Sequence, residues 1–216
     1  ERRLERLDEV LGPELLDRGV DAIVSTNAIH LYPDLADTAA AWLRALRPGG
    51  FVLINSGNIR NPRARRNEWI IDETVGVVGD LAEGLVRNDP AYATYRADLD
   101  DEERMAAHAA YRDRVFLQPR PLDFYIETLE LAGLKVESVR EASIEARVDE
   151  WYELLRTYHD AVLGWVGGTE KIDGAAPSPE AVSDRLTLIR HAMDVLFHGR
   201  PKFQACWTYI TCAKGR

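Results

Sequence analysis

Two short apolar runs on either side of a helical segment constrain the fold of this chain most. Residues 20–25 and 51–55 are nearly all apolar, which is typical of parallel strands that are covered on both faces. Pro33 and Asp34 precede the intervening segment. Its apolar residues recur on one helical face until Arg47, Pro48 and two glycines end it. This order of elements predicts a βαβ unit in a parallel sheet.

Composition narrows the class of protein. The 216 residues are 46% hydrophobic and 29% charged, which suits one ordinary soluble domain. The net charge of -9 argues against a general nucleic-acid or anionic-membrane binder, because attraction to phosphates needs a positive surface. No apolar stretch approaches the roughly 20 residues of a membrane helix.

The two cysteines, Cys206 and Cys212, both fall in the last apolar run. On a single strand they would lie roughly 20 Å apart, too far for a disulfide. Two unpaired cysteines favour a reduced, cytoplasmic setting.

Hydrophobic spacing predicts the remaining elements. Leu4, Leu7, Leu11 and Leu15 predict a helix over residues 2–17. The other predicted helices cover about 70–85, 100–117, 122–132 and 151–165, with one more beginning at Ser178, and strands are predicted over 134–146 and 203–213. The helices between 70 and 117 interrupt the alternation of helix and strand. We therefore expect residues 59–117 to be a helical cap inserted into a core of residues 1–58 and 118–216.

Three stretches of the sequence share a pattern with a known family. They are residues 19–34, residues 46–55, and residues 125–136 followed by the aromatic final strand that ends at Gly215. In this order they resemble the class I S-adenosylmethionine-dependent methyltransferases. The resemblance implies an α/β fold with a doubly wound, Rossmann-like sheet that is mostly parallel and has an antiparallel last strand. It also implies S-adenosylmethionine as cofactor and an oxygen, nitrogen or carbon atom as the methyl acceptor. The predicted helical cap suggests a bounded pocket, and therefore a small-molecule substrate rather than a polymer.

The chain departs from that family in its first residues. Members of the family bind the cofactor through a glycine-rich turn after the first strand and an acidic residue at the end of the second strand. No glycine-rich motif of this kind precedes residue 19. A missing amino-terminal segment, a partner chain such as the second copy of a homodimer, or a loss of activity would each account for this.

The resemblance implies a cofactor site at the end of the first apolar strand. Ser25, Thr26, Asn27 and Ala28 lie there, at the sheet edge where ligands approach in open α/β folds. We expect them to neighbour the cofactor; the alternative is a turn whose polar side chains cap the next helix.

Three further residues are candidates for the methyl acceptor. His30 follows the first strand and could act as a general base, because its pKa lies near neutrality; alternatively it packs or caps. Tyr32 could line the substrate pocket or cover the helix. Arg60 and Arg63 belong to a basic cluster after the second strand and could hold a carboxylate or phosphate, although a solvated loop is the simpler explanation.

The remaining aromatic side chains and histidines have structural explanations rather than catalytic or metal-binding ones. Trp151, Tyr158 and Trp165 form an aromatic stripe whose first expected role is core packing. The remaining histidines do not have the spacing of metal ligands, so no metal is expected.

The preferred hypothesis is therefore S-adenosylmethionine-dependent methyl transfer to a small molecule. A rival hypothesis is a non-catalytic, methyltransferase-like subunit that binds a partner. A second rival, a nicotinamide-dependent α/β enzyme, fits the aromatic antiparallel last strand less well.

Overall fold

The computed structural model describes residues 10–215, in which the chain forms two compact units. The first unit is drawn from Glu1–Ile70, Pro119–Ile144 and Cys206–Arg216, and the second from Ile71–Gln118 and Glu145–Ala205. These boundaries differ from the predicted cap of residues 59–117, because residues 145–205 group with residues 71–118 rather than with the sheet. Of the leucines that predicted the first helix, Leu4 and Leu7 lie outside the described residues.

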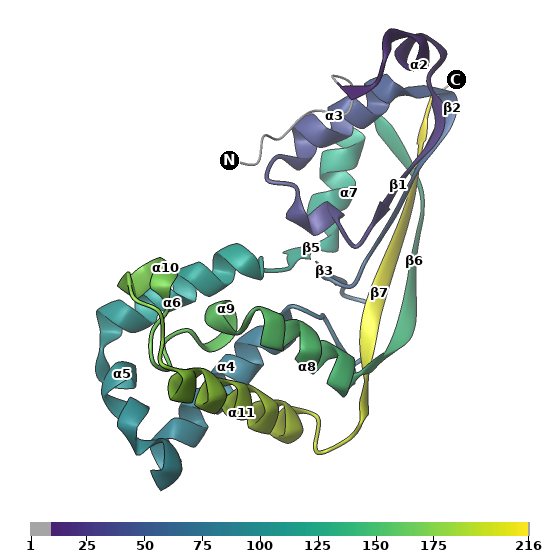
Figure 1. Ribbon diagram of the computed structural model, residues 1–216. Coiled ribbons are helices and arrows are strands. Elements are labelled where there is room, and N and C mark those ends of the chain that lie inside the picture. Colours follow the sequence, from purple (N-terminus) through teal and green to yellow (C-terminus); the bar gives the residue numbers. More distant parts are fainter. Residues whose placement is uncertain (1–9, 216) are drawn as a thin grey trace. The chain divides into compact units, whose positions relative to one another are not determined.

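The first unit contains the sheet and the helices that cover it (Figure 1). Its elements in chain order are α2 (Pro13–Arg18), β1 (Val20–Thr26), η1 (Ile29–Leu31), α3 (Leu35–Ala45), β2 (Leu46–Ser56), β3 (Ile59–Arg60), β4 (Glu68–Trp69), β5 (Arg120–Pro121), α7 (Leu122–Leu131), β6 (Leu134–Arg147) and β7 (Lys202–Lys214). The strands β6 and β7 continue past the boundary of this unit, which lies at residues 144 and 206.

The sheet confirms the predicted α/β fold with an antiparallel last strand. Strand β1 pairs in parallel with β2, so that Val24 lies opposite Leu53. Strand β2 pairs antiparallel with β7, so that Ile54 lies opposite Ile210. The order is β1-β2-β7-β4, with β6 also paired to β7, while β3 and β5 form a separate parallel pair.

One face of this sheet is covered and the other is open in the described residues. Helices α3 and α7 contact each other and bury one face in a single apolar cluster that includes Val52 and Ile54 of β2. The alternate residues point the other way: Val24 is 65% exposed, Phe51 45% and Leu53 41%. A parallel pair is normally covered on both faces. These exposed side chains show that the second helical layer of a doubly wound sheet is not seen in the described residues.

Local chemistry explains how α3 lies between the parallel strands. Asp34 caps the helix, accepting a hydrogen bond from the backbone N–H of Asp37 at 2.9 Å. Before β1, Gly19 adopts φ +71°, and a Cβ there would collide with the backbone of Arg47 at the start of β2. Glycine is therefore required where the two strands approach each other.

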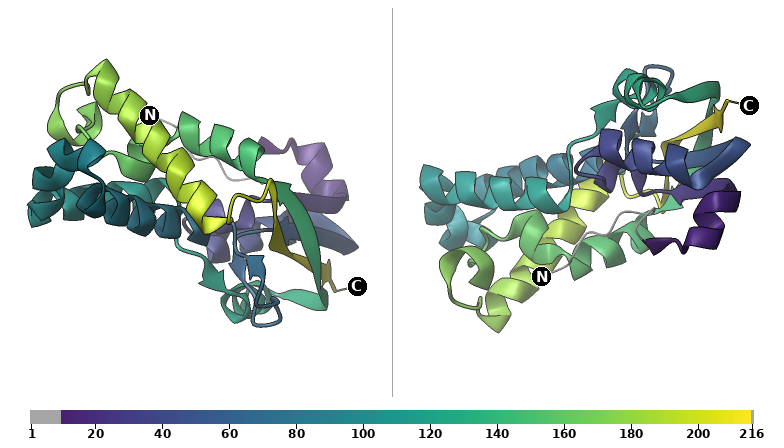
Figure 2. Two further views of the ribbon diagram at one scale, coloured as in Figure 1. Left: turned by 90° about the horizontal axis from the view of Figure 1, so that it is seen from below. Right: turned by 90° about the horizontal axis from the view of Figure 1, so that it is seen from above.

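The second unit is helical. Its elements are α4 (Glu73–Asn88), η2 (Pro90–Tyr95), α5 (Arg96–Asp100), α6 (Glu102–Val115), α8 (Val148–Thr157), α9 (His159–Leu163), α10 (Glu170–Asp173) and α11 (Pro179–Leu196). The long helix α11, yellow-green in Figure 2, packs against α4 and also contacts α8 and α9. No helix among residues 10–215 is long and apolar enough to cross a membrane.

Two predicted helices differ in detail from the observed ones. The helix predicted over 151–165 breaks at Tyr158 into α8 and α9. In α11, which Ser178 caps as predicted, the buried face is Ala181, Arg185, Leu188, Ile189, Ala192 and Met193. Hydrophobic spacing predicts Val182, Leu186, Ile189, Met193 and Leu196 on one face; of these, Ile189 and Met193 are buried and the other three are half-buried.

Candidate functional site

The two parallel strands end beside each other in a polar cluster. Asn27 directly follows β1 in the left-handed conformation, with φ +46°, which asparagine tolerates better than most residues. Its backbone N–H donates to the carbonyl of Asn55 at 2.7 Å. The chain therefore turns sharply at the carboxyl edge of the sheet, where ligands approach in open α/β folds.

Ser56 is the centre of this cluster and is fully buried. Its Oγ donates to Asn27 Oδ1 at 3.2 Å and accepts from the backbone N–H of Asn58 at 3.0 Å. The same oxygen lies 3.2 Å from His30 Nδ1. Ser56 thus joins the turn after β1 to the turn after β2.

The second ring nitrogen of His30 is also engaged, since Nε2 lies 3.2 Å from Asn58 Nδ2. An amide nitrogen only donates, so Nε2 accepts this bond and the ring proton resides on Nδ1, where it points to Ser56. Burial lowers the pKa of His30, which agrees with a neutral imidazole. His30 is therefore placed at the predicted sheet edge with both ring nitrogens hydrogen-bonded.

The predicted cofactor neighbours lie in different environments at the end of β1. Ser25 is buried, and its Oγ has no hydrogen-bond partner among the described residues. Thr26 and Asn27 are exposed, but Asn27 Oδ1 is already held by Ser56 and by the N–H of Gly57 at 3.3 Å. Ala28 is half-buried. A ligand at this edge would thus meet backbone groups, the hydroxyl of Thr26 and the amide nitrogen of Asn27.

The predicted substrate residues do not join the His30 cluster. The ring of Tyr32 packs edge-on against Trp42 of α3, with centroids 5.6 Å apart. Arg60 is exposed in β3. Arg63 lies 3.7 Å from Glu141, and its backbone N–H donates to Asn61 Oδ1 at 2.9 Å.

Sequence reasoning missed Ser56, Asn58 and the contacts of Asn55. Trp207 Nε1 donates to Asn55 Oδ1 at 3.0 Å, which ties β7 to the end of β2. The available signal was the run of small and amide side chains from Asn55 to Asn58 directly after an apolar strand. A strand end rich in hydrogen-bonding side chains is where such a cluster should be sought.

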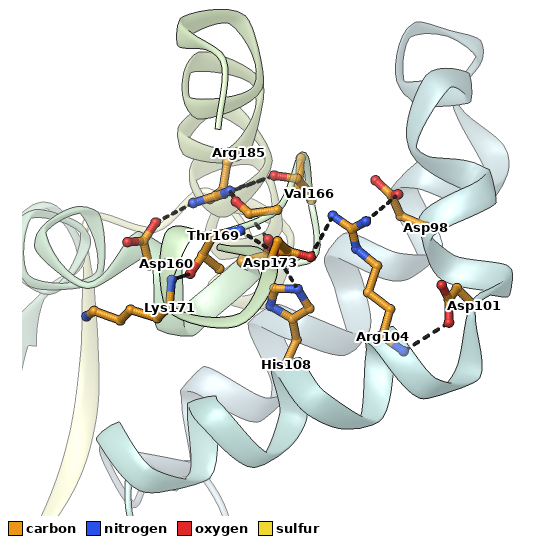
Figure 3. Close-up of polar contacts among 12 residues, drawn as sticks. Asp98, Asp101, Arg104, His108, Asp160, Val166, Thr169, Lys171, Asp173 and Arg185 are labelled. Carbon is orange, nitrogen blue, oxygen red and sulfur yellow. Dashed lines mark hydrogen bonds and ion pairs between the residues drawn. The ribbon is translucent and has the colours of Figure 1, made fainter. Parts of the chain in front are cut away.

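The second unit holds a separate polar network around Arg185 (Figure 3). The Arg185 side chain is fully buried and donates to Asp160 Oδ1 at 2.6 Å. It also donates to the carbonyls of Val166 and Gly168, each at 2.7 Å, and to His159 Nδ1 at 2.9 Å. A buried guanidinium is tolerated only with such complete pairing.

Next to it, Asp173 connects α10 to α6. Its Oδ2 accepts from the backbone N–H of Thr169 at 2.6 Å and lies 3.7 Å from His108 Nε2, while its Oδ1 lies 3.6 Å from Arg104. Burial lowers the pKa of His108, against the opposing effect of Asp173. His108 and His159, which show no metal-ligand spacing in the sequence, thus both belong to the polar interior of this unit.

These side chains do not form a metal site. No group of three or more His, Cys, Asp or Glu side chains within residues 10–215 is arranged to hold a metal ion.

The chain matches no protein-family model and no curated protein. Solved structures similar to it include a protein of Bacillus halodurans C-125 named as a methyltransferase, at 13% identity and a TM-score of 0.45, covering 92% of this chain and 66% of that one. The YcgJ protein of Bacillus subtilis has 13% identity and a TM-score of 0.46, with coverage of 92% and 65%. The cyclopropane synthase MmaA2 of Mycobacterium tuberculosis has 19% identity and a TM-score of 0.36, with coverage of 91% and 56%. The chain spans no more than about two thirds of the length of these proteins.

Proposed function

We propose that this chain is part of an S-adenosylmethionine-dependent methyltransferase that acts on a small molecule. The observation that carries the proposal is the sheet edge: a parallel pair, flanked by an antiparallel β7, ends in the buried cluster of Asn27, His30, Ser56 and Asn58. The motifs that resemble the family fall on these same strands. The carboxyl ends of parallel strands are also where α/β enzymes bind their ligands.

The residues at the end of β1 fit one portion of the cofactor. Ser25 offers a buried hydroxyl without a partner among the described residues, and Asn27 is an exposed residue whose amide nitrogen can donate. Unpaired buried polar atoms are uncommon in folded proteins and call for an explanation such as a ligand. No glycine-rich turn precedes β1 in this sequence. Ser25 and Asn27 would therefore form only one wall of the cofactor site.

S-adenosylmethionine, when bound, supplies a methyl group made electrophilic by its sulfonium sulfur. This chain would position the methyl acceptor and accept the proton that the acceptor releases. A neutral His30 can accept a proton at Nε2 once its hydrogen bond from Asn58 opens. Ser56 would steady the imidazolium by holding Nδ1–H.

A calorimetric titration with S-adenosylmethionine tests the proposal. We expect binding to this chain, or to its complex with a co-purified partner, and weaker binding after Asn27→Ala. The control is Ser138→Ala, at an exposed position of β6. If neither the chain nor such a complex binds S-adenosylmethionine, the proposal fails.

The open sheet face favours a second candidate function, a non-catalytic subunit that binds a partner. Val24, Phe51 and Leu53 present apolar surface where a parallel sheet is usually covered. The same titration separates the two candidates. A co-purified protein that protects these three residues from hydrogen exchange, without conferring S-adenosylmethionine binding, would favour the subunit.

A further inference from the structure

The second unit contains a cavity of about 420 Å³ for which the proposed methyl transfer gives no role. Its walls come from α4, α6 and the segment around α9. The polar lining consists of Asp80, Glu83, Glu102, Arg112 and His108, and the apolar lining includes Trp165. The volume suits a small ligand, since ligand pockets begin at about 300 Å³.

The charge of the lining is negative. Three carboxylates face one guanidinium, that of Arg112. No salt bridge joins Asp80, Glu83 or Glu102 to a basic residue in the part of the chain that the structure describes. Burial, followed by the neighbouring Asp80, raises the pKa of Glu83 against the opposing effects of Arg87 and Arg112.

The lining suits an organic cation better than a metal ion. The acidic side chains do not form a metal-binding group among residues 10–215. Met105, Val162 and Trp165 supply an apolar wall beside the carboxylates. Trp165 is 4% exposed, and an indole face is the strongest aromatic partner for an ammonium group.

His108 is an independent sign of an incomplete site. It lines the cavity and is 3% exposed, yet neither of its ring nitrogens has a hydrogen-bond partner among the described residues. Its Nδ1 faces Gly164, where a Cβ would lie within 2.8 Å of it. Asp173 Oδ2 lies 3.7 Å from its Nε2, beyond hydrogen-bond distance. A buried imidazole without hydrogen bonds costs free energy, so the position of His108 in the wall of an acidic cavity favours a ligand there.

We propose that this cavity binds a small organic cation, a protonated amine whose ammonium group lies among Asp80, Glu83 and Glu102. Its hydrocarbon part packs on Met105 and Trp165. The site lies wholly within the second unit and does not depend on the proposed methyl transfer.

The test is a calorimetric titration of the whole chain with butylammonium chloride, compared with butan-1-ol and sodium butyrate as neutral and anionic isosteres. Butylammonium is expected to bind more tightly than either isostere. Glu102→Gln is expected to weaken binding up to about fivefold, which corresponds to the roughly 1 kcal/mol that an exposed ion pair contributes.

Glu103→Gln is the matched control. Glu103 adjoins Glu102 in the first turn of α6 but does not line the cavity, so the variant is expected to bind like the wild type. Both glutamates are exposed, which keeps the fold intact in either variant. A ring-proton shift of His108 on titration, with His191 and His198 unmoved at their exposed positions, gives a second readout.

The proposal is overturned if butan-1-ol binds as tightly as butylammonium, or if both glutamine variants behave alike. Absence of butylammonium binding at millimolar concentration also overturns it. None of these outcomes involves S-adenosylmethionine, so the failure of this site and the failure of the proposed methyl transfer are distinguishable.

Discussion

Arg185 donates a hydrogen bond to Asp160 at 2.6 Å from a side chain that is completely buried. The same guanidinium bonds the carbonyls of Val166 and Gly168. One side chain of α11 therefore holds the irregular segment that follows α9. The carbonyls of that segment lie outside regular helix and would otherwise be buried without donors.

Replacing Arg185 should be among the most damaging single changes in the second unit. Arg185→Ala removes the donor to the half-exposed Asp160 and to the carbonyls of Val166 and Gly168, and each buried group left unpaired costs about 1–3 kcal/mol. Urea unfolding measures the loss. Arg190→Ala is the control, because Arg190 is paired with Asp149 at the surface, and such pairs contribute about 1 kcal/mol or less. Equal losses in the two variants would show that the buried network is not stabilising.

Two glycines with nearly the same positive φ distinguish backbone strain from a steric clash. Gly19 and Gly49 adopt φ +71° and +73°, but only the Cβ of an alanine at Gly19 would meet another atom, the backbone of Arg47. Both substitutions place a side chain at positive φ, at a cost of about 1–3 kcal/mol. Gly19→Ala should therefore lower the free energy of unfolding more than Gly49→Ala. A smaller loss for Gly19→Ala would mean that the two strands are not held this close.

The sequence predicts the elements of this fold better than their packing. Period-2 and period-3.6 patterns depend on neighbours along the chain, so they locate β1, α3, β2 and β7. Which layer a helix joins depends on complementary surfaces far away in sequence. For this reason the sequence predicts residues 145–205 in the core, whereas in the structure they group with residues 71–118.

The candidate site can be predicted only in part, because most of its contacts join residues that lie far apart in the sequence. The position of His30 at the sheet edge follows from the strand that precedes it. Its partners Ser56 and Asn58 lie 26 and 28 residues away, and only the parallel register of β1 and β2 brings them together. Arg185 escaped notice because a buried arginine on an apolar helix face contradicts the usual pattern.

The two cysteines should resist thiol reagents in the folded protein. Both are free and buried on β7, and burial raises the pKa of the Cys212 thiol to about 12 and also raises that of Cys206. Because the thiolate is the reactive form, a colorimetric thiol assay at pH 8 should detect almost no reaction in buffer and two thiols in denaturant. Rapid labelling of either cysteine without denaturant would show that β7 opens readily.

Stability should fall as the pH drops below about 6.5, the ordinary pKa of histidine. Burial is the main cause that lowers the pKa values of His30, His108 and His159 in the folded state. The unfolded chain therefore binds more protons than the folded one in this range, so acidification favours unfolding. Urea unfolding at pH 7.5 and 5.5 measures the change. His108→Gln should reduce the difference between the two pH values, and an unchanged difference would exclude His108 as a contributor.

Ser56→Ala tests whether one hydroxyl holds the candidate site together. The variant removes the acceptor for the N–H of Asn58 and for His30, together with the donor to Asn27. Leaving buried groups unpaired costs about 1–3 kcal/mol each, and the exposed control Ser138→Ala should leave stability nearly unchanged. In nitrogen-15 spectra, wild-type His30 should carry its proton on Nδ1, and this proton should exchange much faster in Ser56→Ala because it has lost its buried acceptor. A proton that resides on Nε2 in the wild type would contradict the assigned hydrogen-bond direction, and with it the role of Asn58 as donor.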